Sequence, residues 1–467
     1  MPRHSLSRLE PLIGHDRFEE LQRAVSVARE QLRGKTIWNI NSTATGGGVA
    51  EMLLVLVGYM LDADIDVRWL VIKGDEEFFA ITKRIHNRLH GMAGDKGDLG
   101  QSEAAHYSDV SVANASSAAK QVRPGDIVLL HDPQTAGMAA PLVGAGARVV
   151  WRSHIGCETS NEWTDQAWSF LRGHLAACSA YVFSVASYVP TWVEDSRAWV
   201  IPPSIDPFSP KNQEMGGDEV MHTLRGMGLL PDGDQGSPGK FTRRDGSAGL
   251  VRQRASILSA GPSLDPGAAL VVQVSRWDKL KDMAGVMNGF ASYVVGRADA
   301  QLALVGPSTA GVTDDPEGAD VFSACVAAWE ALPSEERERV RLVTLPMDDV
   351  DENAAMVNAL QRHATVIVQK SLAEGFGLTV AEGMWKARAV LASRVGGIAA
   401  QIAPGTGLLL EDPTDLSAFG EILAALLAHP AEIAELGAQA RRHVLDGFVG
   451  DEHLMRYAHL IAWLLSF

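Results

Sequence analysis

The sequence is poor in cysteine, in long apolar runs and in positive charge, and each shortage excludes a class of protein. Its three cysteines, Cys157, Cys178 and Cys325, lie far apart without C-x-x-C spacing, so neither a disulfide framework nor a zinc site is indicated. No run of about eighteen apolar residues occurs, so no membrane-spanning helix is predicted. The formal net charge of −16 argues against an extended nucleic-acid surface, which needs a basic face.

The first residues also lack the apolar segment of a secretory signal, because His4, Arg8 and Glu10 fall within them. We therefore expect a soluble protein of the reducing cytoplasm. With 467 residues, of which 46% are hydrophobic, the chain is too long for one ordinary core, and we expect two domains. If such an acidic protein binds an anion, a few local basic residues must hold it.

The first two hundred residues alternate helical segments with short, β-branched, apolar strands. Apolar residues recur at helical spacing over residues 9–33. The predicted strands cover residues 36–40, 67–72, 126–130, 148–151, 181–184 and 199–201. Strands of this kind suit a parallel sheet covered on both faces, and such sheets gather functional residues at the carboxyl ends of the strands.

Three consecutive glycines follow the first predicted strand, in N-S-T-A-T-G-G-G-V-A-E. Gly46, Gly47 and Gly48 would let backbone N–H groups approach a phosphate at the start of the helix predicted over residues 49–61. The dipole of that helix would favour an anion by about 0.3–1 kcal/mol. A tight strand-to-helix turn without a ligand is the alternative interpretation.

Polar residues end two further strands of the same predicted sheet. His131, Asp132 and Gln134 follow I-V-L-L, and His154 follows V-V-W-R-S. A carboxylate at such a position can accept hydrogen bonds from sugar hydroxyls, and a histidine can donate to a hydroxyl or a carbonyl. Each histidine could instead be a satisfied structural residue, but two such places on one sheet edge favour a ligand.

Residues 206–266 have a different composition and form the predicted domain junction. They are rich in proline and glycine and show little periodicity, apart from short helices predicted at residues 220–227 and 250–258. The predicted division is a first Rossmann-like α/β domain at 1–205, a linker and insertion at 206–266, a second Rossmann-like α/β domain at 267–440 and a C-terminal helix at 441–467.

A second series of strands and helices follows the junction. Strands are predicted at residues 269–274, 302–305, 340–345, 365–368 and 389–391, and helices at 321–332, 352–362 and 416–427. Arg276 and Lys281 lie just past the first of these strands, where a guanidinium fork and an ammonium group could hold phosphate oxygens. A solvated run of surface charge is the alternative.

The stretch K-S-L-A-E-G-F-G-L-T-V-A-E at residues 370–382 places a turn between an apolar strand and a helical run. Glu374 and Glu382, eight positions apart, bracket its glycines, which indicates a site for a polar ligand. An acidic D-A-D-I-D run at residues 62–66 resembles a metal signature, but it lies between a helix and the start of a strand. We therefore expect a solvated turn there and no bound metal.

In this order, these residues resemble the retaining glycosyltransferases of the GT-B fold. Within that group the chain is most similar to trehalose-forming glycosyltransferring synthases, and the resemblance covers nearly its whole length. The motifs that carry it are H-D-P-Q at 131, V-W-R-S-H-I at 150, P-P-S-I-D-P at 202, Q-V-S-R-W-D at 273 and E-G-F-G-L-T-V-A-E-G-M-W-K at 374. The resemblance implies an α/β fold with two Rossmann-like domains facing across a cleft and a final helix that crosses back to the first domain.

The resemblance also implies a reaction, in which glucose from a nucleotide sugar such as UDP-glucose or ADP-glucose joins the anomeric hydroxyl of free glucose with retention. No cofactor beyond this substrate is expected. The implied catalytic residues are Arg276, Lys281, Glu374 and His154. The implied donor-binding residues are Gly46, Gly47, Gly48, Arg276, Lys281, Glu374, Gly375, Phe376, Gly377, Leu378, Thr379 and Glu382. The implied acceptor-binding residues are His131, Asp132 and Gln134.

The resemblance implies specific roles for several of these residues. Arg276 and Lys281 would neutralise the diphosphate leaving group, Glu382 would hold the ribose hydroxyls, and Glu374 would bind hydroxyls of the donor sugar. No covalent nucleophile can be named, so we expect a front-face mechanism in which the leaving phosphate helps to deprotonate the acceptor. The expected partners are a nucleotide-sugar donor and a small sugar acceptor, without nucleic acid or membrane. A homodimer is one option for the oligomeric state.

Four other functions stay open from the sequence. A trehalose phosphorylase would share these motifs, and a related transferase of secondary metabolism would make another 1,1-linked disaccharide. A dinucleotide-dependent oxidoreductase would explain the first glycine loop but not Arg276 and Lys281. A nucleotide-sugar-binding protein without activity is the last.

Overall fold

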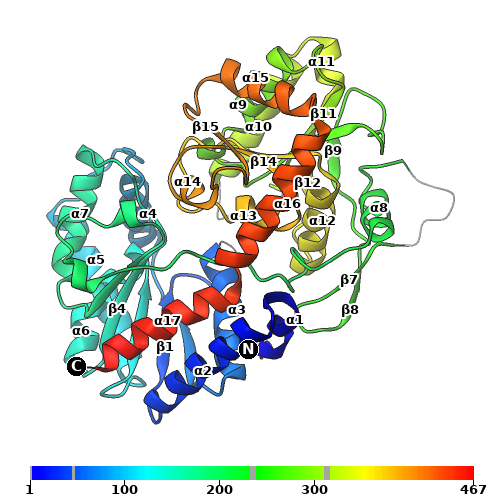
Figure 1. Ribbon diagram of the computed structural model, residues 1–467. Coiled ribbons are helices and arrows are strands. Elements are labelled where there is room, and N and C mark those ends of the chain that lie inside the picture. The colour runs from blue at the N-terminus through cyan, green and yellow to red at the C-terminus, as the bar shows by residue number, and fades with distance from the viewer. Residues whose placement is uncertain (1–2, 45–47, 232–237, 310–315, 467) are drawn as a thin grey trace. The chain divides into compact units, whose positions relative to one another are not determined.

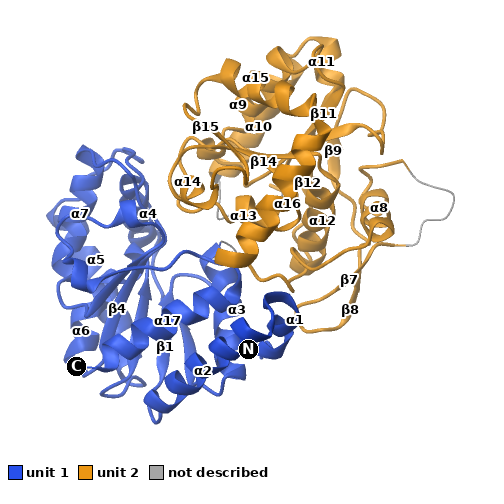
Figure 2. Ribbon diagram, viewed as in Figure 1, with its two compact units in different colours: residues 1–204, 448–467 blue, residues 205–447 orange. Residues whose placement is uncertain are grey.

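The computed structural model describes residues 3–44, 48–231, 238–309 and 316–466 and divides the chain into two compact units (Figure 1). Unit 1 comprises Met1–Ser204 and Phe448–Phe467, and unit 2 comprises Ile205–Gly447 (Figure 2). Each unit has its own sheet and its own hydrophobic core.

Unit 1 is built on a six-stranded parallel sheet with the order β2-β1-β3-β4-β5-β6. The strands are β1 (Ile37–Asn41), β2 (Val67–Val71), β3 (Ile127–His131), β4 (Arg148–Ser153), β5 (Ala180–Phe183) and β6 (Ala198–Val200). The chain runs outward from β1 to β2 and then returns to β3 on the other side of β1. The strand order therefore reverses between β1 and β3.

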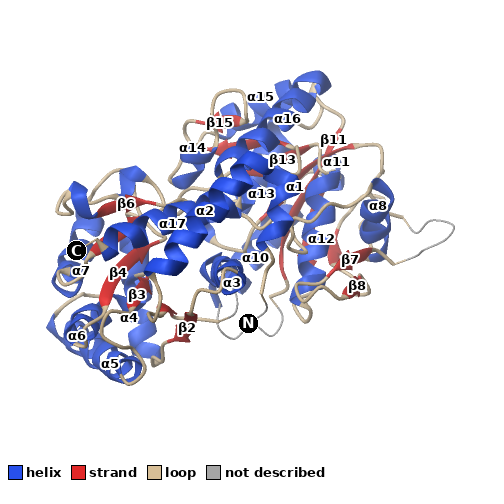
Figure 3. Ribbon diagram, turned by 60° about the horizontal axis from the view of Figure 1, so that its bottom comes forward, coloured by secondary structure: helices blue, strands red, loops and turns tan. Residues whose placement is uncertain are grey.

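Helices cover both faces of this sheet because its strand residues alternate between two buried sides. Trp38, Val128 and Trp151 belong to a core shared with α4 to α7, and α2 and α17 lie side by side on the other face (Figure 3). Asp75 begins α4 and Asn161 begins α7 by accepting hydrogen bonds from backbone N–H groups. The main helices are α2 (His15–Gln31), α3 (Gly48–Asp62), α4 (Glu76–Leu89), α5 (Gln101–Ala119), α6 (Ala139–Gly144), α7 (Glu162–Leu175) and α17 (Gly450–Leu465).

Unit 2 contains a seven-stranded sheet with the order β15-β14-β13-β10-β11-β12-β9, in which only the edge strand β9 is antiparallel to its neighbour within the described residues. The strands are β9 (Ser256–Leu258), β10 (Ala269–Val274), β11 (Ala300–Pro307), β12 (Val340–Leu345), β13 (Val366–Gln369), β14 (Ala389–Ser393) and β15 (Leu408–Leu410). A separate hairpin pairs β7 (Lys240–Thr242) with β8 (Ala248–Leu250). Here the order reverses between β10 and β13.

Asp349 and Asp415 cap two helices of unit 2, α12 and α15, by accepting backbone N–H groups. The helices are α8 (Gly217–Gly226), α9 (Met283–Tyr293), α10 (Pro316–Glu330), α11 (Ser334–Glu338), α12 (Val350–His363), α13 (Leu378–Trp385), α14 (Gly397–Gln401), α15 (Leu416–Leu427) and α16 (Pro430–Gly447). No single helix of the described chain is both long and apolar enough to cross a membrane. α15 and α16 meet that test only together, with a bend of 100° between them.

One predicted helix was wrong in part, and another was wrong altogether. The helix predicted over residues 9–33 is interrupted at Gly14, whose φ of 83° ends α1 (Glu10–Ile13) before α2 begins. The helix predicted at residues 250–258 is absent, because that segment ends β8 and then forms β9, which pairs with β12. Strands of three residues are too short to show their own periodicity, so long-range pairing decides their structure.

Candidate active site

Both groups of predicted site residues lie where the strand order of their sheet reverses. In unit 2, Lys281 follows β10 and Glu374 follows β13, the two strands beside the reversal. In unit 1, His131 ends β3, one of the two strands beside the reversal, and Gly48 begins the helix that comes after β1 in the chain. Ligands of open α/β sheets bind outside the carboxyl ends of the strands at such points. The topology therefore places both groups where a ligand is expected.

Lys281 and Glu374 form a close ion pair in unit 2, although 93 positions separate them. Both side chains are largely covered, with 15% and 13% of their surface exposed. Ser371 Oγ also donates to Glu374 Oε2 at 3.4 Å. The two residues predicted to act on the leaving group and the donor sugar are thus brought together at one point.

A layer of buried polar groups holds this ion pair in place. Gln273 Nε2 donates to the Lys281 carbonyl at 2.7 Å, and Gln273 Oε1 accepts the Lys370 backbone N–H at 3.0 Å. The Lys370 ammonium group pairs with Asp282, which adopts a left-handed φ of 45° and caps α9. β10 and β13 are therefore tied together directly beneath Lys281.

Arg276 does not join the pair in this structure. Its side chain is 61% exposed, and its guanidinium lies 3.3 Å from Asp278, two positions along the chain. The sequence predicted that Arg276 and Lys281 act together on phosphate. In the structure Lys281 pairs with Glu374, whereas Arg276 pairs with Asp278. An exposed arginine is free to reorient, so its role in phosphate binding stays a prediction.

The glycine-rich turn before α13 needs a glycine at Gly377. Its φ of 81° is left-handed, and a Cβ there would lie 3.0 Å from Glu374 Cγ and 3.1 Å from Ile398. Gly377 allows α13 to begin at Leu378, so the turn presents the start of a helix beside Glu374. Thr379 Oγ1 donates to Gln369 Oε1 at 2.8 Å and fixes the first turn.

Two further predicted donor residues of this turn serve as supports. Phe376 is buried, and its carbonyl accepts from Gln401. The carbonyl of Gly375 accepts the Gly397 N–H at 3.1 Å. The backbone of the turn is therefore anchored to α14.

Glu382 lies on α13 and is almost fully buried. Its Oε1 is 3.4 Å from the Lys211 ammonium group, and its Oε2 has no hydrogen-bond partner among the described atoms. One turn later, Lys386 donates to Asn212 Oδ1 at 2.9 Å, and burial lowers its pKa to about 7. A buried carboxylate oxygen without a donor is costly, so Glu382 is suited to receive a hydroxyl from a ligand.

Asp132 has a strained backbone in unit 1. Its φ of 63° and ψ of 177° fall in a region that residues other than glycine almost never occupy. The conformation aims its Oδ1 at the His154 backbone N–H, 2.8 Å away, while Trp151 Nε1 donates to the Asp132 carbonyl at 3.0 Å. Strain of this kind persists only where the surroundings enforce it, and it concentrates at functional sites.

Two stacked histidines lie beside Asp132. The His131 and His154 rings are 5.4 Å apart and inclined by 13°, and His131 Nδ1 is 3.1 Å from His154 Nε2. His131 Nε2 lies 3.1 Å from Asn39 Oδ1. Burial, aided by the charge of Arg152, lowers the pKa of His131 to about 3 and that of His154 far below its ordinary value. Both rings are therefore neutral near pH 7.

The carboxyl group of Asp132 is shifted in the opposite direction. Burial raises its pKa to about 7, while the His154 N–H and the charge of Arg152 act against the rise. Asp132 therefore changes charge close to neutral pH. An ionised carboxylate accepts hydrogen bonds from hydroxyls, so its ability to hold a sugar should increase as the pH rises through 7.

The remaining predicted site residues of unit 1 are the three glycines and Gln134. Gly46 and Gly47 lie outside the described residues, and Gly48 is the first residue of α3. Gln134 is half-buried in the short 3-10 helix Pro133–Met138 that follows Asp132. Within the part of the chain that the structure describes, no cluster of three histidine, cysteine, aspartate or glutamate residues is placed to hold a metal ion.

The strain at Asp132 makes a testable prediction for stability. Asp132→Gly and Asp132→Ala both remove the carboxylate, but only glycine tolerates this backbone conformation. We expect the glycine variant to be more stable than the alanine variant by about 1 kcal/mol, the net of strain relief and glycine's greater entropy loss. Thermal unfolding of both variants tests this, and an alanine variant of equal or greater stability would show that Asp132 is not strained.

Several supporting residues were missed from the sequence. Asn39 and Arg152 are polar residues inside apolar strands, and that break in pattern was the available signal. Gln273 carried the same signal within β10. Lys211 was assigned to the linker, and nothing local in the sequence connects it with Glu382, 171 positions away.

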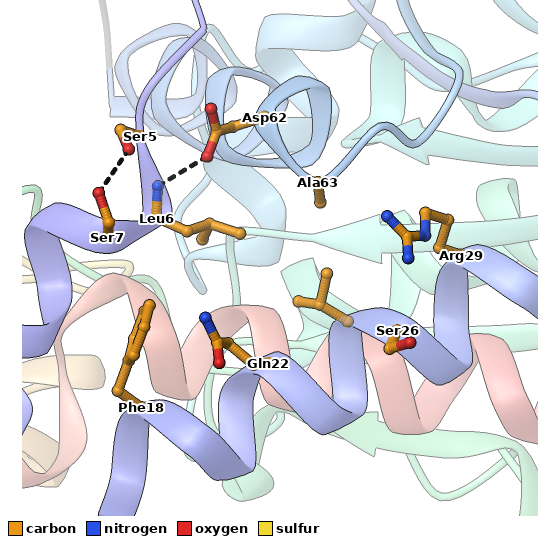
Figure 4. A pocket seen from close by; sticks show the side chains of 10 residues that line it. Ser5, Leu6, Ser7, Phe18, Gln22, Ser26, Arg29, Asp62 and Ala63 are labelled. Atoms are coloured by element: carbon orange, nitrogen blue, oxygen red, sulfur yellow. Dashed lines mark hydrogen bonds between the residues drawn. The ribbon is translucent and has the colours of Figure 1, made fainter. Parts of the chain in front are cut away.

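A surface cavity of about 330 Å³ lies elsewhere in unit 1 (Figure 4). Ser5, Gln22, Arg29 and Asp62 line part of it, and Asp62 Oδ2 accepts the Leu6 N–H at 2.9 Å. Asp62 ends α3 just before β2, so the cavity is at the amino edge of the sheet. None of the predicted site residues lines it.

Comparison with known proteins gives four findings. The sequence profile of the family described as trehalose synthase, N-terminal domain, matches residues 39–190, and that of glycosyl transferases group 1 matches residues 271–429. A trehalose synthase of Rubrobacter xylanophilus is 33% identical over 464 residues, covering 99% of this chain and 97% of the relative. A trehalose phosphorylase of Pleurotus pulmonarius is 25% identical over 455 residues, covering 92% of this chain and 57% of the relative.

The fourth finding is a likeness of fold. The crystal structure of an alpha,alpha-trehalose-phosphate synthase (UDP-forming) from Burkholderia xenovorans in complex with glucose-6-phosphate matches with a TM-score of 0.65 at 16% identity. The match covers 92% of this chain and 100% of that chain. It confirms the predicted α/β architecture of the GT-B type.

Proposed function

The chain belongs to the trehalose synthase family and is a glycosyltransferase, and on this premise we propose that it transfers glucose from a nucleoside-diphosphate glucose to the anomeric hydroxyl of glucose. The product is trehalose, and the donor's anomeric configuration is retained. Unit 2 binds the donor, and unit 1 orients the acceptor.

The observation that carries this proposal is the Lys281–Glu374 pair at the reversal between β10 and β13. An ammonium group at this point can bind diphosphate oxygens. A carboxylate beside it can accept hydrogen bonds from hydroxyls of the attached sugar. A nucleotide sugar presents both chemical groups next to each other. Glu382, on the helix that follows, supplies the unpartnered oxygen that a ribose hydroxyl would satisfy.

Catalysis then consists mainly of stabilising the leaving group. Cleavage of the bond between the sugar and the phosphate leaves negative charge on the diphosphate, and Lys281 stabilises that charge, with Arg276 able to turn towards it. Lys281 must exchange Glu374 for the phosphate when the donor binds. Glu374 is then free to hold the sugar. No cofactor is required.

The acceptor is held by the polar groups at the end of β3. Asp132 accepts a hydrogen bond from a hydroxyl of the incoming glucose, and the neutral His154 contacts the donor sugar. The acceptor hydroxyl attacks on the face from which the nucleotide leaves, and the leaving phosphate takes its proton. Positioning of the two sugars supplies much of the rate, because it replaces a bimolecular encounter with an aligned one.

A donor and acceptor screen tests the function. UDP-, ADP-, GDP- and TDP-glucose are each incubated with free glucose and with other monosaccharides, and the products are identified by mass and anomeric coupling. We expect a non-reducing 1,1-linked disaccharide with glucose as acceptor. Transfer only to a different sugar would indicate the related transferase instead.

A trehalose phosphorylase is the second candidate, because a relative of that name aligns with 92% of this chain. Lys281 and Arg276 could hold inorganic phosphate in place of a diphosphate. Incubation of trehalose with phosphate separates the two activities, since a phosphorylase releases glucose 1-phosphate and glucose. We expect no such release.

Glu382 provides a prediction for donor affinity. Glu382→Ala removes the buried carboxylate that would accept ribose hydroxyls, and loss of charged hydrogen bonds worth about 1.5–3 kcal/mol raises the donor KM about tenfold or more. Steady-state kinetics with varied nucleotide sugar measures the change.

A matched control is Glu352→Ala, which removes another buried glutamate of unit 2 that accepts the Arg252 and Gln253 N–H groups. It should lower thermal stability without changing the donor KM. An unchanged donor KM in Glu382→Ala would contradict ribose binding at that residue.

A further inference from the structure

Arg152 is a fully buried charged residue on β4. Among the described residues, no carboxylate forms an ion pair with it, and its Nε has no hydrogen-bond partner. A buried guanidinium without an ion-pair partner costs several kcal/mol of desolvation, so its presence within a buried strand indicates a function. The register pairs Arg152 with His131 on β3, which places it beneath the candidate acceptor site.

The C-terminal helix holds this guanidinium. Arg152 Nη1 donates to the Tyr457 hydroxyl of α17, and the guanidinium carbon lies 5.5 Å from the centre of the Tyr457 ring. Nη2 donates to the Ile201 carbonyl at 3.1 Å. His453, one turn before Tyr457, donates from its Nδ1 to the Pro202 carbonyl at 2.9 Å. The hydrogen-bond partners of the Arg152 guanidinium are thus neutral groups.

Groups of the acceptor site and of the C-terminal helix lie around this charge. They are His131 and Asp132 at the end of β3, His154 just after β4, and His453 and Tyr457 on α17. Arg456 acts in addition on His453. Asp132 is the one group of this set whose negative form Arg152 stabilises.

We propose that Arg152 is a positioning residue for the transfer, which keeps Asp132 in its ionised, hydroxyl-accepting form by charge alone and is itself held in place by Tyr457 of the C-terminal helix. The proposal rests on the proposed acceptor role of Asp132. It gives α17 a part in the site without any contact between α17 and substrate.

Two opposing effects act on the carboxyl group of Asp132. Burial raises the pKa of Asp132 to about 7, and Arg152 opposes that rise. The two residues are neighbours on adjacent strands, since the Asp132 N–H donates to the Arg152 carbonyl at 2.8 Å. Without the cation the pKa should therefore rise further. The neutral form of the two histidines does not depend on Arg152, because burial is the larger cause of their lowered pKa.

The test compares three variants across pH. Arg152→Met removes the charge and keeps most of the side-chain volume, and Arg152→Lys keeps the charge. Arg197→Met is the matched control, because Arg197 also stacks over a tyrosine, Tyr181, and donates to a backbone carbonyl, that of Cys178, but does not influence Asp132. The rate of disaccharide formation is measured for each from pH 5.5 to pH 9.

We expect the midpoint of the rise in transfer rate near pH 7 to move to higher pH in Arg152→Met, because the cation that favours the ionised carboxylate is lost. It should stay near the wild-type value in Arg152→Lys and Arg197→Met. An equal loss of rate at every pH, without a moved midpoint, would reduce Arg152 to a purely structural role and overturn the proposal.

A second measurement does not depend on activity. The folded pKa of Asp132 lies above its unfolded value near 4, so its contribution to stability is full below pH 4 and is lost as the pH rises through the folded pKa. In Arg152→Met the folded pKa is higher still, so more stability is lost between pH 5 and pH 8. The melting temperature should therefore fall more over that range than in wild type or Arg197→Met, and an identical fall would contradict the proposal.

The two measurements separate the possible failures. If no nucleotide sugar supports transfer, the proposed function fails, while the melting curves still test Arg152. If Arg152→Met does not fold, Tyr457→Phe replaces it, since loss of the hydroxyl releases the guanidinium from its place. An upward shift of the midpoint is again expected, and an unchanged midpoint in Tyr457→Phe would overturn the proposal.

Discussion

Replacing Lys281 with alanine should lower kcat by about 10²–10³, with little change in the fold of unit 2. The reason is that Lys281 is the covered cation at the reversal of the sheet, where charge develops on the leaving diphosphate. Removal of one preorganised group of this kind typically costs that much in rate. The rate of glucose transfer from nucleoside-diphosphate glucose, monitored through the release of the nucleotide, measures the effect.

Lys279→Ala is the matched control for this prediction. Lys279 lies two positions away in the same short 3-10 helix, but its side chain is 76% exposed and 3.9 Å from Glu317. Loss of an exposed pair is worth about 0–1 kcal/mol, so the control should keep near-normal activity. Near-normal activity in Lys281→Ala as well would remove Lys281 from the phosphate site.

Replacing Asp132 with alanine should separate transfer from donor hydrolysis. The carboxylate at the end of β3 is proposed to orient the acceptor, whereas the donor is bound by residues of unit 2. Loss of hydrogen bonds to a charged group costs about 1.5–3 kcal/mol, so transfer should fall about tenfold or more. Hydrolysis of the nucleotide sugar should fall much less, and parallel assays of disaccharide and free glucose measure both rates.

The control for Asp132 is Asp126→Asn, at the opposite end of the same strand. Asp126 is buried and accepts from the Thr36 N–H and from Trp38 Nε1, so its replacement should destabilise unit 1. It should leave the ratio of transfer to hydrolysis unchanged. Equal loss of transfer and hydrolysis in Asp132→Ala would count against an acceptor role.

The strands of both sheets could be predicted from sequence because their apolar, β-branched runs are buried on two faces. β10 and β12 were predicted with the bounds that the structure gives them. What failed depended on contacts distant in sequence. Nothing local distinguishes residues 250–258 from a short helix until Ile257 pairs with Val343. The interruption at Gly14 depends on a backbone angle that glycine permits but does not require.

The candidate site was predictable to the extent that it follows strand ends. Lys281, Glu374 and Asp132 follow buried strands by seven, five and one positions, so the sheet of each unit brings them to its carboxyl edge. The close pairing of Lys281 with Glu374, and the exposure of Arg276, depend on side-chain geometry that spacing does not encode. The support from Arg152 and Tyr457 joins residues 305 positions apart, beyond any local pattern.

The most direct test of the proposed reaction uses glucose labelled with an isotope at its anomeric carbon as the acceptor, with an unlabelled nucleoside-diphosphate glucose as the donor. The account predicts one α,α-1,1-linked disaccharide labelled in a single ring, formed in equal amount with the nucleoside diphosphate. Anomeric coupling by nuclear magnetic resonance and nucleotide release measure the two products. Absence of the labelled disaccharide with every nucleotide donor, together with glucose 1-phosphate from trehalose and phosphate, would contradict it.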